Sequence, residues 1–258
     1  MSKPTLRQCL PGLLGTVLAL CLTPVMAEAQ TAPILDHFKC YRTTGEPPNQ
    51  TVLLRDQFDI PGVAPDKSFV WVPVKFCNPV EKTTPDGVVT PIKDINAHLE
   101  MFIVAPGRID PPRRVVVRNQ FGTQRITTYG PRLLAVPSAK DSQPPPENLD
   151  HFKCYSTNGR GKQIELRLSD QFQQDTTAKL LRPVVFCNPV EKTHGDVITP
   201  IKNPESHLLC YNITPTTFPP EEHRVRNQFA PNAVTLLMGT ADMLCVPSQK
   251  LRFSTITP

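Results

Sequence analysis

Residues 35–41 read LDHFKCY and residues 76–82 read FCNPVEK, and both stretches return almost unchanged at residues 149–155 and 186–192. Each pair of stretches encloses the triplet Asp-Gln-Phe. Weaker copies of the same pattern begin at His98 and His207, where the triplet is Asn-Gln-Phe. A pattern that returns about every 55 residues indicates a repeated supersecondary unit, and this repeat decides the fold before any single residue does.

The four copies define unit 1 (residues 37–82), unit 2 (98–140), unit 3 (151–192) and unit 4 (207–250). A unit starts with a histidine, has a cysteine position three residues later, carries the triplet in its middle, and ends in Cys-x-Pro-x-x-Lys. The landmark residues are His37, Cys40, Cys77, Pro79 and Lys82 in unit 1; His98, Met101, Ala135, Pro137 and Lys140 in unit 2; His151, Cys154, Cys187, Pro189 and Lys192 in unit 3; and His207, Cys210, Cys245, Pro247 and Lys250 in unit 4.

The cysteines follow the repeat. Unit 2 lacks both cysteines and has Met101 and Ala135 in their places. This joint loss is expected if the two positions bond to each other and neither is useful alone. The sequence therefore predicts the disulfides Cys40–Cys77, Cys154–Cys187 and Cys210–Cys245. Each would close a loop of roughly 35 residues and stabilise the fold by about 3–4 kcal/mol.

Residues 1–29 have the layout of a secretory signal peptide, in which Lys3 and Arg7 precede an apolar run. We therefore expect a secreted or periplasmic protein, in which disulfides are the default state of cysteine. Lipid anchoring at Cys21 is not expected, because Leu20 stands where bacterial lipid attachment wants a small residue. No later stretch approaches the roughly 18 consecutive apolar residues of a membrane span. The formal net charge of +5 is too mild to indicate a nucleic-acid-binding protein.

The units group in pairs. Residues 86–93, DGVVTPIK, link units 1 and 2, and residues 196–202, DVITPIK, link units 3 and 4. Between units 2 and 3 a Pro-rich segment stands instead, which is typical of an extended linker. The predicted organisation is a signal peptide at 1–29, a first domain at 30–142, a linker at 143–148 and a second domain at 149–258. Each domain is long enough to bury its own core.

Strand periodicity dominates both predicted domains. Ile164, Leu166 and Leu168 alternate with polar or charged residues, which places apolar side chains on one face of a strand. Turn residues separate such runs at short intervals, as in antiparallel all-β folds. We therefore predict two tandem, antiparallel β-sandwich or barrel-like domains, each containing two units. The alternative is a closed, propeller-like ring of all four units.

The blocks at residues 35–41, 76–82, 149–155 and 186–192 resemble those of a family of secreted bacterial domains of unknown function, often found in tandem in exported proteins. The resemblance covers nearly all of the chain after residue 29. It implies export and a tandem arrangement, and it implies no activity, cofactor or catalytic residue. Unit 2 departs from the family pattern because it lacks the cysteines.

The recurring histidines His37, His98, His151 and His207 are of a type that binds zinc or copper. Each occurs once per unit at the same place, so a local hydrogen bond that every unit needs explains them better than a metal. Asp56 and Asp170 are replaced by Asn in the other units, which indicates a hydrogen bond that stabilises a turn. The sequence contains no nucleophile elbow or phosphate-binding glycine loop. We expect no metal and no cofactor.

Unit 2 differs from unit 4 in charge. Residues 108–132 carry six arginines and one acidic residue, whereas the matching residues 217–245 carry two arginines and three acidic residues. If Val115 and Val117 face the core, Arg114 lies on the outer face, where a guanidinium group can receive phosphate, sulfate or carboxylate. Arg118 matches Arg226 of unit 4 and is taken as framework. The candidate binding residues are Arg108, Arg113, Arg114, Arg125 and Arg132.

These observations predict an exported, disulfide-stapled, non-enzymatic binding or structural protein. The expected partner is an anionic polysaccharide or another cell-surface component, and not a nucleic acid. One alternative is that the arginines are ordinary solvated surface. Another is an extracellular hydrolase whose site forms between the domains. Carboxylates or histidines with strongly shifted pKa values in a concave pocket would favour that enzyme.

Overall fold

The computed structural model describes residues 35–256. Within this range the protein is all-β, as predicted, and its strands form one antiparallel sheet of 15 strands. The described range contains no helix that could cross a membrane. The predicted signal peptide and Cys21 lie outside the described residues.

Each unit contributes a first strand, a short middle strand and a long last strand. These are β1 (Phe38–Thr44), β2 (Gln50–Asp56) and β3 (Asp66–Pro79) in unit 1; β6 (His98–Ala105), β7 (Arg113–Asn119) and β8 (Gly122–Lys140) in unit 2; β9 (Phe152–Asn158), β10 (Ile164–Ser169) and β11 (Thr176–His194) in unit 3; and β13 (His207–Thr216), β14 (Glu221–Asn227) and β15 (Ala230–Thr255) in unit 4. The links between paired units add β4 (Glu81–Thr83), β5 (Val89–Thr90) and β12 (Val197–Thr199). The alternation predicted for β10 is confirmed, since Leu166 and Leu168 are buried and the residues between them are exposed.

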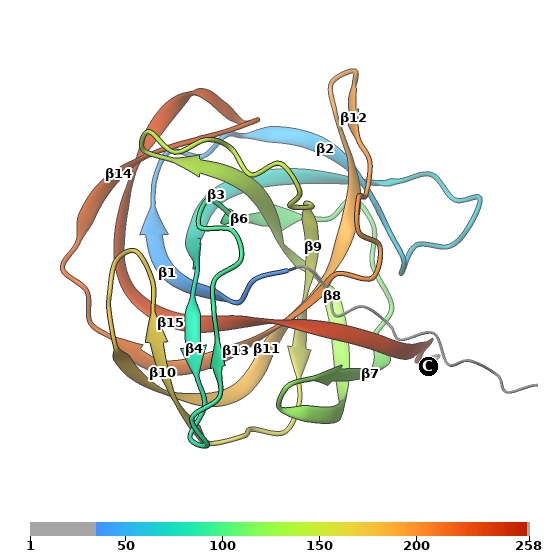
Figure 1. The fold of residues 1–258 in the computed structure, drawn as a ribbon. Helices are drawn as coiled ribbons and strands as arrows, with labels where there is room; N and C mark the ends of the chain where they lie inside the picture. The colour runs from blue at the N-terminus through green and yellow to red at the C-terminus, as the bar shows by residue number, and fades with distance from the viewer. Residues whose placement is uncertain (1–34, 257–258) are drawn as a thin grey trace, which may run out of the picture. The chain divides into compact units, whose positions relative to one another are not determined.

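The first and last strands of the four units form a closed circuit of hydrogen-bonded neighbours. Its order is β1, β3, β6, β8, β9, β11, β13, β15 and again β1 (Figure 1). Three short middle strands pair with the last strand of the unit two places away: β2 with β11, β7 with β15, and β14 with β8. The fourth, β10 of unit 3, pairs with β4, which follows the last strand of unit 1. Strands of different units are therefore direct neighbours, and the units are not separate blades.

The linker at residues 143–148 connects β8 to β9, which are themselves neighbours in the circuit. The pairs β1 with β15 and β2 with β11 also join the two segments predicted as separate domains. The described residues, 35–256, all belong to one compact unit. The two predicted domains thus share strand pairs, and fragment expression can establish whether each folds separately.

All three predicted disulfides are confirmed. In each unit that has them, the two cysteines face each other directly across the first and last strands. Met101 and Ala135 occupy the same cross-strand position in unit 2. These eight side chains belong to one buried apolar cluster together with Phe38, Leu99, Phe152 and Leu208. The six cysteines are therefore part of the interior packing and carry no free thiol.

The repeated lysine and phenylalanine hold neighbouring units together. The lysine of each unit lies over the triplet phenylalanine of the next unit, between 4.5 and 5.8 Å from the ring centroid. The pairs are Lys82–Phe121, Lys140–Phe172, Lys192–Phe229 and Lys250–Phe58. The last pair returns to unit 1, so these contacts close in the same cyclic order as the strands.

The first residue of the triplet serves two contacts. Its side-chain oxygen accepts the backbone N–H two residues later in all four units, which confirms the predicted turn bond. Asp56 and Asp170 also accept the hydroxyls of Tyr155 and Tyr41 from the opposite unit, at 3.0 and 2.9 Å. Asn227 instead donates to the Glu100 carboxylate at 2.6 Å. The partner in the opposite unit therefore decides whether the first triplet residue is Asp, which accepts a hydrogen bond, or Asn, which can donate one.

Candidate anion-binding face

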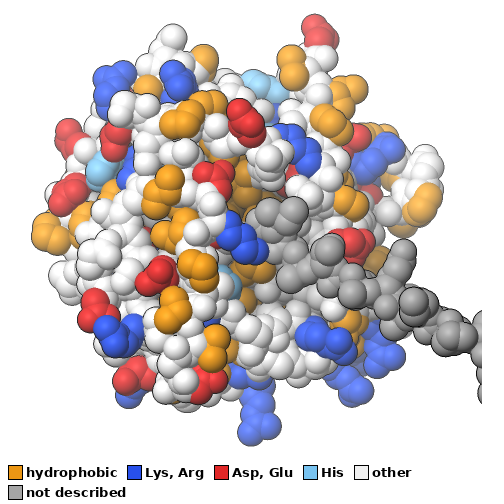
Figure 2. Space-filling view, in the orientation of Figure 1, with side chains coloured by type: hydrophobic (Ala, Val, Ile, Leu, Met, Phe, Trp, Pro, Cys, Tyr) orange, Lys and Arg blue, Asp and Glu red, His pale blue; other side chains and the backbone are white. Residues whose placement is uncertain are grey.

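Strand β7 lies between the start of β8 and the end of β15. Val115 and Val117 are fully buried, as predicted, and Arg114 and Arg118 are exposed. The turn from β7 into β8 uses Gly122, whose φ of 98° lies in the left-handed region that favours glycine. In the view of Figure 2, basic side chains gather over the region where Figure 1 places β7.

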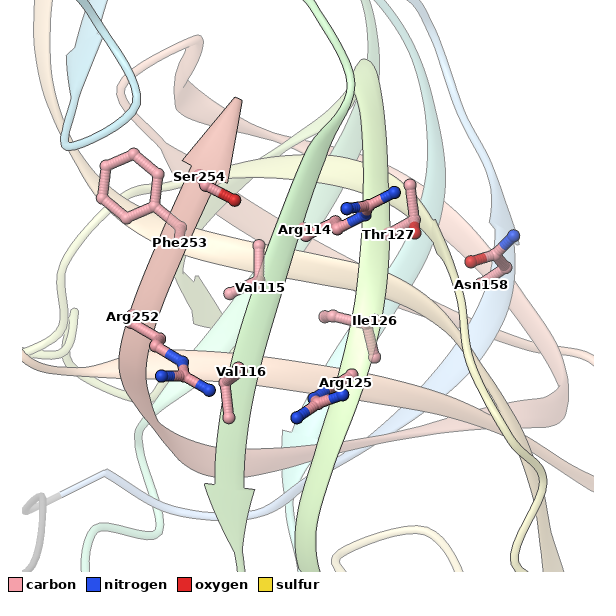
Figure 3. Close-up of a pocket in the computed structure, with 10 residues that line it drawn as sticks. All are labelled: Arg114, Val115, Val116, Arg125, Ile126, Thr127, Asn158, Arg252, Phe253 and Ser254. Carbon is pink, nitrogen blue, oxygen red and sulfur yellow. The ribbon is translucent and has the colours of Figure 1, made fainter. Parts of the chain in front are cut away.

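The outer face of these three strands carries side chains in rungs. Arg114 stands between Thr127 and Ser254, and Val116 stands between Arg125 and Arg252. Since neighbouring strands are about 4.8 Å apart, the Cα atoms of Arg125 and Arg252 lie about 10 Å apart. Figure 3 shows the guanidinium groups of these two residues leaning toward Val116 from opposite sides, whereas that of Arg114 extends toward Thr127. We call this surface the β7 face.

The β7 face borders a hollow of about 520 Å³, and none of the lining residues within 35–256 is acidic. Its lining residues are Arg114, Val115, Val116, Arg125, Ile126, Thr127, Asn158, Arg252, Phe253 and Ser254. Within residues 35–256, Arg114, Arg125 and Arg252 have neither an ion-paired carboxylate nor a hydrogen-bonded side chain. Three guanidinium groups therefore keep their charge and their donors available to a ligand.

Two of the predicted binding residues have other partners. Arg113 points to the same side as Val115, is 3% exposed, and contacts the Asp110 carboxylate at 3.3 Å. Its guanidinium group also donates to the Phe58 carbonyl at 2.9 Å and stacks over the Phe58 ring. Arg108 pairs with Asp59. Arg132 is exposed on β8 but does not line the hollow.

A buried charge network lies on the inner side of this region. The fully buried Lys153 ammonium lies 3.3 Å from Asp66, 3.8 Å from Asp110 and 3.9 Å from Asp59. Together with Arg108 and Arg113, these residues make three cations and three carboxylates. The network is therefore neutral, and it leaves the exposed charge of the β7 face uncompensated.

Arg252 was missed by sequence reasoning. It belongs to unit 4, more than 120 residues from Arg114 and Arg125, and reaches them only because β15 continues past Lys250 and pairs with β7. A signal was present in residues 251–255, LRFST, which alternate as a strand does after the last repeat landmark. Thr127, Asn158 and Ser254 were also missed, because single polar residues on strands carry no motif.

Three of the four repeated histidines hydrogen-bond to glutamines distant in sequence. His37 and His151 contact Gln120 and Gln228 of the following units, and His98 contacts Gln143, each at 2.8 Å. The prediction of a local hydrogen bond in every unit is therefore wrong, because these three bonds join segments distant in sequence and neither ring nitrogen of His207 has a hydrogen-bond partner among the described residues. Burial lowers the pKa of His37 and His98 to about 4, so both rings are neutral at pH 7. No cluster of three or more His, Cys, Asp or Glu in the described chain is arranged to hold a metal ion.

A second hollow, of about 540 Å³, combines matching residues at the start of units 1 and 3, including Asp36 and Asp150 just before them, with residues of the links that follow these units. Asp36 accepts the backbone N–H groups of Lys93 and Asp94 at 2.7 and 3.0 Å. Asp150 accepts those of Lys202 and Asn203 at 2.7 and 2.8 Å. Burial raises the pKa of Asp36 despite these bonds. Both carboxylates anchor loops, so neither is a free general base.

A family model described as a repeat of unknown function, DUF7450, matches residues 98–247, which is more than half of the chain. The chain belongs to this family. The match begins at the histidine of unit 2 and ends at the proline of unit 4, so its limits coincide with landmarks of the repeat. No curated protein and no solved structure matches the chain.

Proposed function

We propose that this protein is an exported, non-enzymatic binding module whose β7 face holds an anionic ligand. The observation that carries the proposal is the set of three exposed guanidinium groups, Arg114, Arg125 and Arg252. In the described part of the chain they have no acidic partner, and no acidic residue lines the hollow beside them. Arginine presents several donors in a rigid fork that matches carboxylate, sulfate and phosphate oxygens.

The scaffold supports binding at a fixed geometry. Val115, Val117 and Ile126 anchor the inner side of the same strands in the core. Three disulfides lie in the interior, and such cross-links persist in oxidising compartments, which supports export. A rigid sheet holds arginines in place without ordering a loop on binding, so less conformational entropy is lost.

The hydrolase alternative has less support. An extracellular hydrolase needs a carboxylate or imidazole that can exchange a proton with a substrate in an open cleft. In the second hollow, Asp36 and Asp150 each accept two backbone N–H groups. The four repeated histidines are buried, and three of them contact glutamine side chains.

The test is retention of the oxidised chain from residue 30 on immobilised heparin over a range of salt concentrations. We expect retention that weakens with salt, because exposed charges are screened over about 10 Å at 0.1 M. The variant Arg114→Gln/Arg125→Gln/Arg252→Gln should bind about tenfold more weakly or worse, since each exposed charge contact contributes about 0.5–1 kcal/mol.

The matched control removes three exposed arginines from other strands: Arg55 of β2, Arg182 of β11 and Arg226 of β14. This variant has the same net charge as the test variant. It should bind heparin nearly as wild type does. Equal loss in the two variants would show that binding follows net charge and not the β7 face, and would refute the proposal.

A further inference from the structure

The three arginines of the β7 face form two separate anion positions. Arg125 and Arg252 lean toward each other over Val116, so their guanidinium groups can hold one anionic group between them (Figure 3). Arg114 extends toward Thr127 and away from that position. The rung of Arg114 lies two residues from the rung of Val116, which is about 7 Å along the strand. One small anion cannot contact all three arginines at that spacing.

The surface around these two positions is neutral and rich in hydrogen-bonding groups. Thr127 and Ser254 flank Arg114 and contribute hydroxyl groups, and Asn158 contributes an amide. The Asn158 amide nitrogen donates to the Tyr129 hydroxyl at 2.8 Å, which leaves its carbonyl oxygen to accept from a ligand. Hydroxyl donors and acceptors of this kind match the hydroxyl groups of sugars.

The aromatic groups of the region favour a saccharide over a single-stranded nucleic acid. The Phe253 ring packs on the Phe58 ring at 4.9 Å and lies under Lys250, and Figure 3 shows it directed away from the arginines. Tyr129 is 42% exposed beside Asn158. Phe253 is also 42% exposed, but it pairs with Val115 on the inner side of the sheet and not with the arginine rungs. A single ring on the arginine side can cover a sugar, whereas single-stranded nucleic acid is held by a series of stacking rings.

We infer that the ligand of the β7 face is an acidic polysaccharide, which runs along β7 between β15 and β8 and places two successive anionic groups on the Arg125–Arg252 position and the Arg114 position. This inference rests on the proposed function and adds the ligand class and the two-position geometry. The face is an addition to the repeated framework. Its third strand is the part of β15 beyond Lys250, where four residues pair with residues of β7. The corresponding contact, between β14 of unit 4 and β8 of unit 2, consists of only two residue pairs.

The experiment is competition against immobilised heparin with the oxidised chain from residue 30. The competitors are sodium sulfate, glucose 6-sulfate, heparin fragments of two, four and six sugars, and a single-stranded oligothymidylate with the charge of the largest fragment. All are compared per anionic group at one ionic strength. We expect the four-sugar fragment to compete at least tenfold better than glucose 6-sulfate, and sulfate to act no better than chloride.

Variants separate the two positions. With Arg114→Gln, the four-sugar fragment should compete little better than glucose 6-sulfate, because the variant deletes the second anion position and leaves the first. Arg252→Gln should weaken all sulfated competitors, because it opens the first position. Tyr129→Ala and Asn158→Ala should each weaken the four-sugar fragment several-fold without changing competition by glucose 6-sulfate.

Two results would overturn the inference alone: equal competition per anionic group by sulfate and by the fragments, or stronger competition by the oligothymidylate than by the six-sugar fragment. The second result would assign the face to a nucleic acid. If the triple arginine variant binds heparin as wild type does, the proposed function fails together with the inference. The two failures are therefore distinguishable.

Discussion

Lys39 and Lys153 occupy matching positions in units 1 and 3, and both are fully buried. Their surroundings differ. The Lys39 ammonium donates to the Gln173 side chain at 2.8 Å and forms no salt bridge with a carboxylate of residues 35–256. The Lys153 ammonium is held by three carboxylates, those of Asp59, Asp66 and Asp110, at 3.3–3.9 Å. We predict that the same substitution, Lys to Met, changes stability by very different amounts at these two positions.

Lys153→Met should destabilise the fold by about 3–5 kcal/mol, because removing one partner of a buried ion network leaves the other uncompensated. Asp59 and Asp110 keep Arg108 and Arg113, but Asp66 keeps only the Ser68 hydroxyl and the Gly107 N–H. Lys39→Met should stay within about 1 kcal/mol of wild type or exceed it, because burial already lowers the pKa of Lys39 and disfavours its charge. The Gln173 oxygen would still accept from Thr216.

The assay is urea unfolding of the oxidised chain from residue 30 at pH 7. A loss of 3–5 kcal/mol lowers the urea midpoint by roughly 1–2 M at a slope of about 2–3 kcal/mol/M. The double variant Lys153→Met/Asp66→Asn should recover at least about 1 kcal/mol, since it removes the carboxylate that has no guanidinium partner. Equal midpoints for the two single variants, or no recovery in the double variant, would refute the reasoning.

Three further predictions concern the framework. Met101→Cys/Ala135→Cys should form a fourth disulfide, detectable by non-reducing peptide mapping, and raise stability by up to about 3 kcal/mol, because these residues face each other as the cysteines of the other units do. Residues 30–142 and 149–258 should each be unfolded by circular dichroism when expressed alone, because strand pairs join the two segments; two folded fragments would support two independent domains. Burial raises the pKa of Glu100 to about 8, so the free energy of unfolding of wild type is highest below pH 4.5 and falls as pH rises through 8. Glu100→Gln should therefore be more stable than wild type in urea at pH 8 and equal to it near pH 4. A stability difference that does not change with pH would show that Glu100 is solvated.

The sequence predicted the framework well because the fold repeats itself. A residue that recurs four times can be compared with its own copies. Unit 2 has Met101 and Ala135 in place of both cysteines, and this joint replacement revealed the disulfide pairing. Comparison of copies says nothing about which units become neighbours. The contacts of Lys82 with Phe121 and of Tyr41 with Asp170 depend on the closed circuit. Such long-range pairings have no local signature in the chain.

The candidate arginines show the same limit at the site. Alternation along β7 places Arg113 on the side of Val115, so its burial could have been predicted from the strand pattern alone. The role of Arg252 could not, because nothing local indicates that β15 continues beside β7. A count of charges within one unit therefore included a buried arginine and omitted an exposed one from another unit.

The two sides of β7 explain how a framework strand can also carry a ligand face. The inner side, Arg113, Val115 and Val117, is held by burial and by the Asp110 ion pair, so its residues cannot change without loss of stability. The outer side, Arg114 and Val116, makes no framework contact beyond its backbone pairs. Substitutions on the outer side therefore change surface charge at a cost of about 0–1 kcal/mol. Recognition on this fold can diverge on outer strand faces while the repeated interior stays the same.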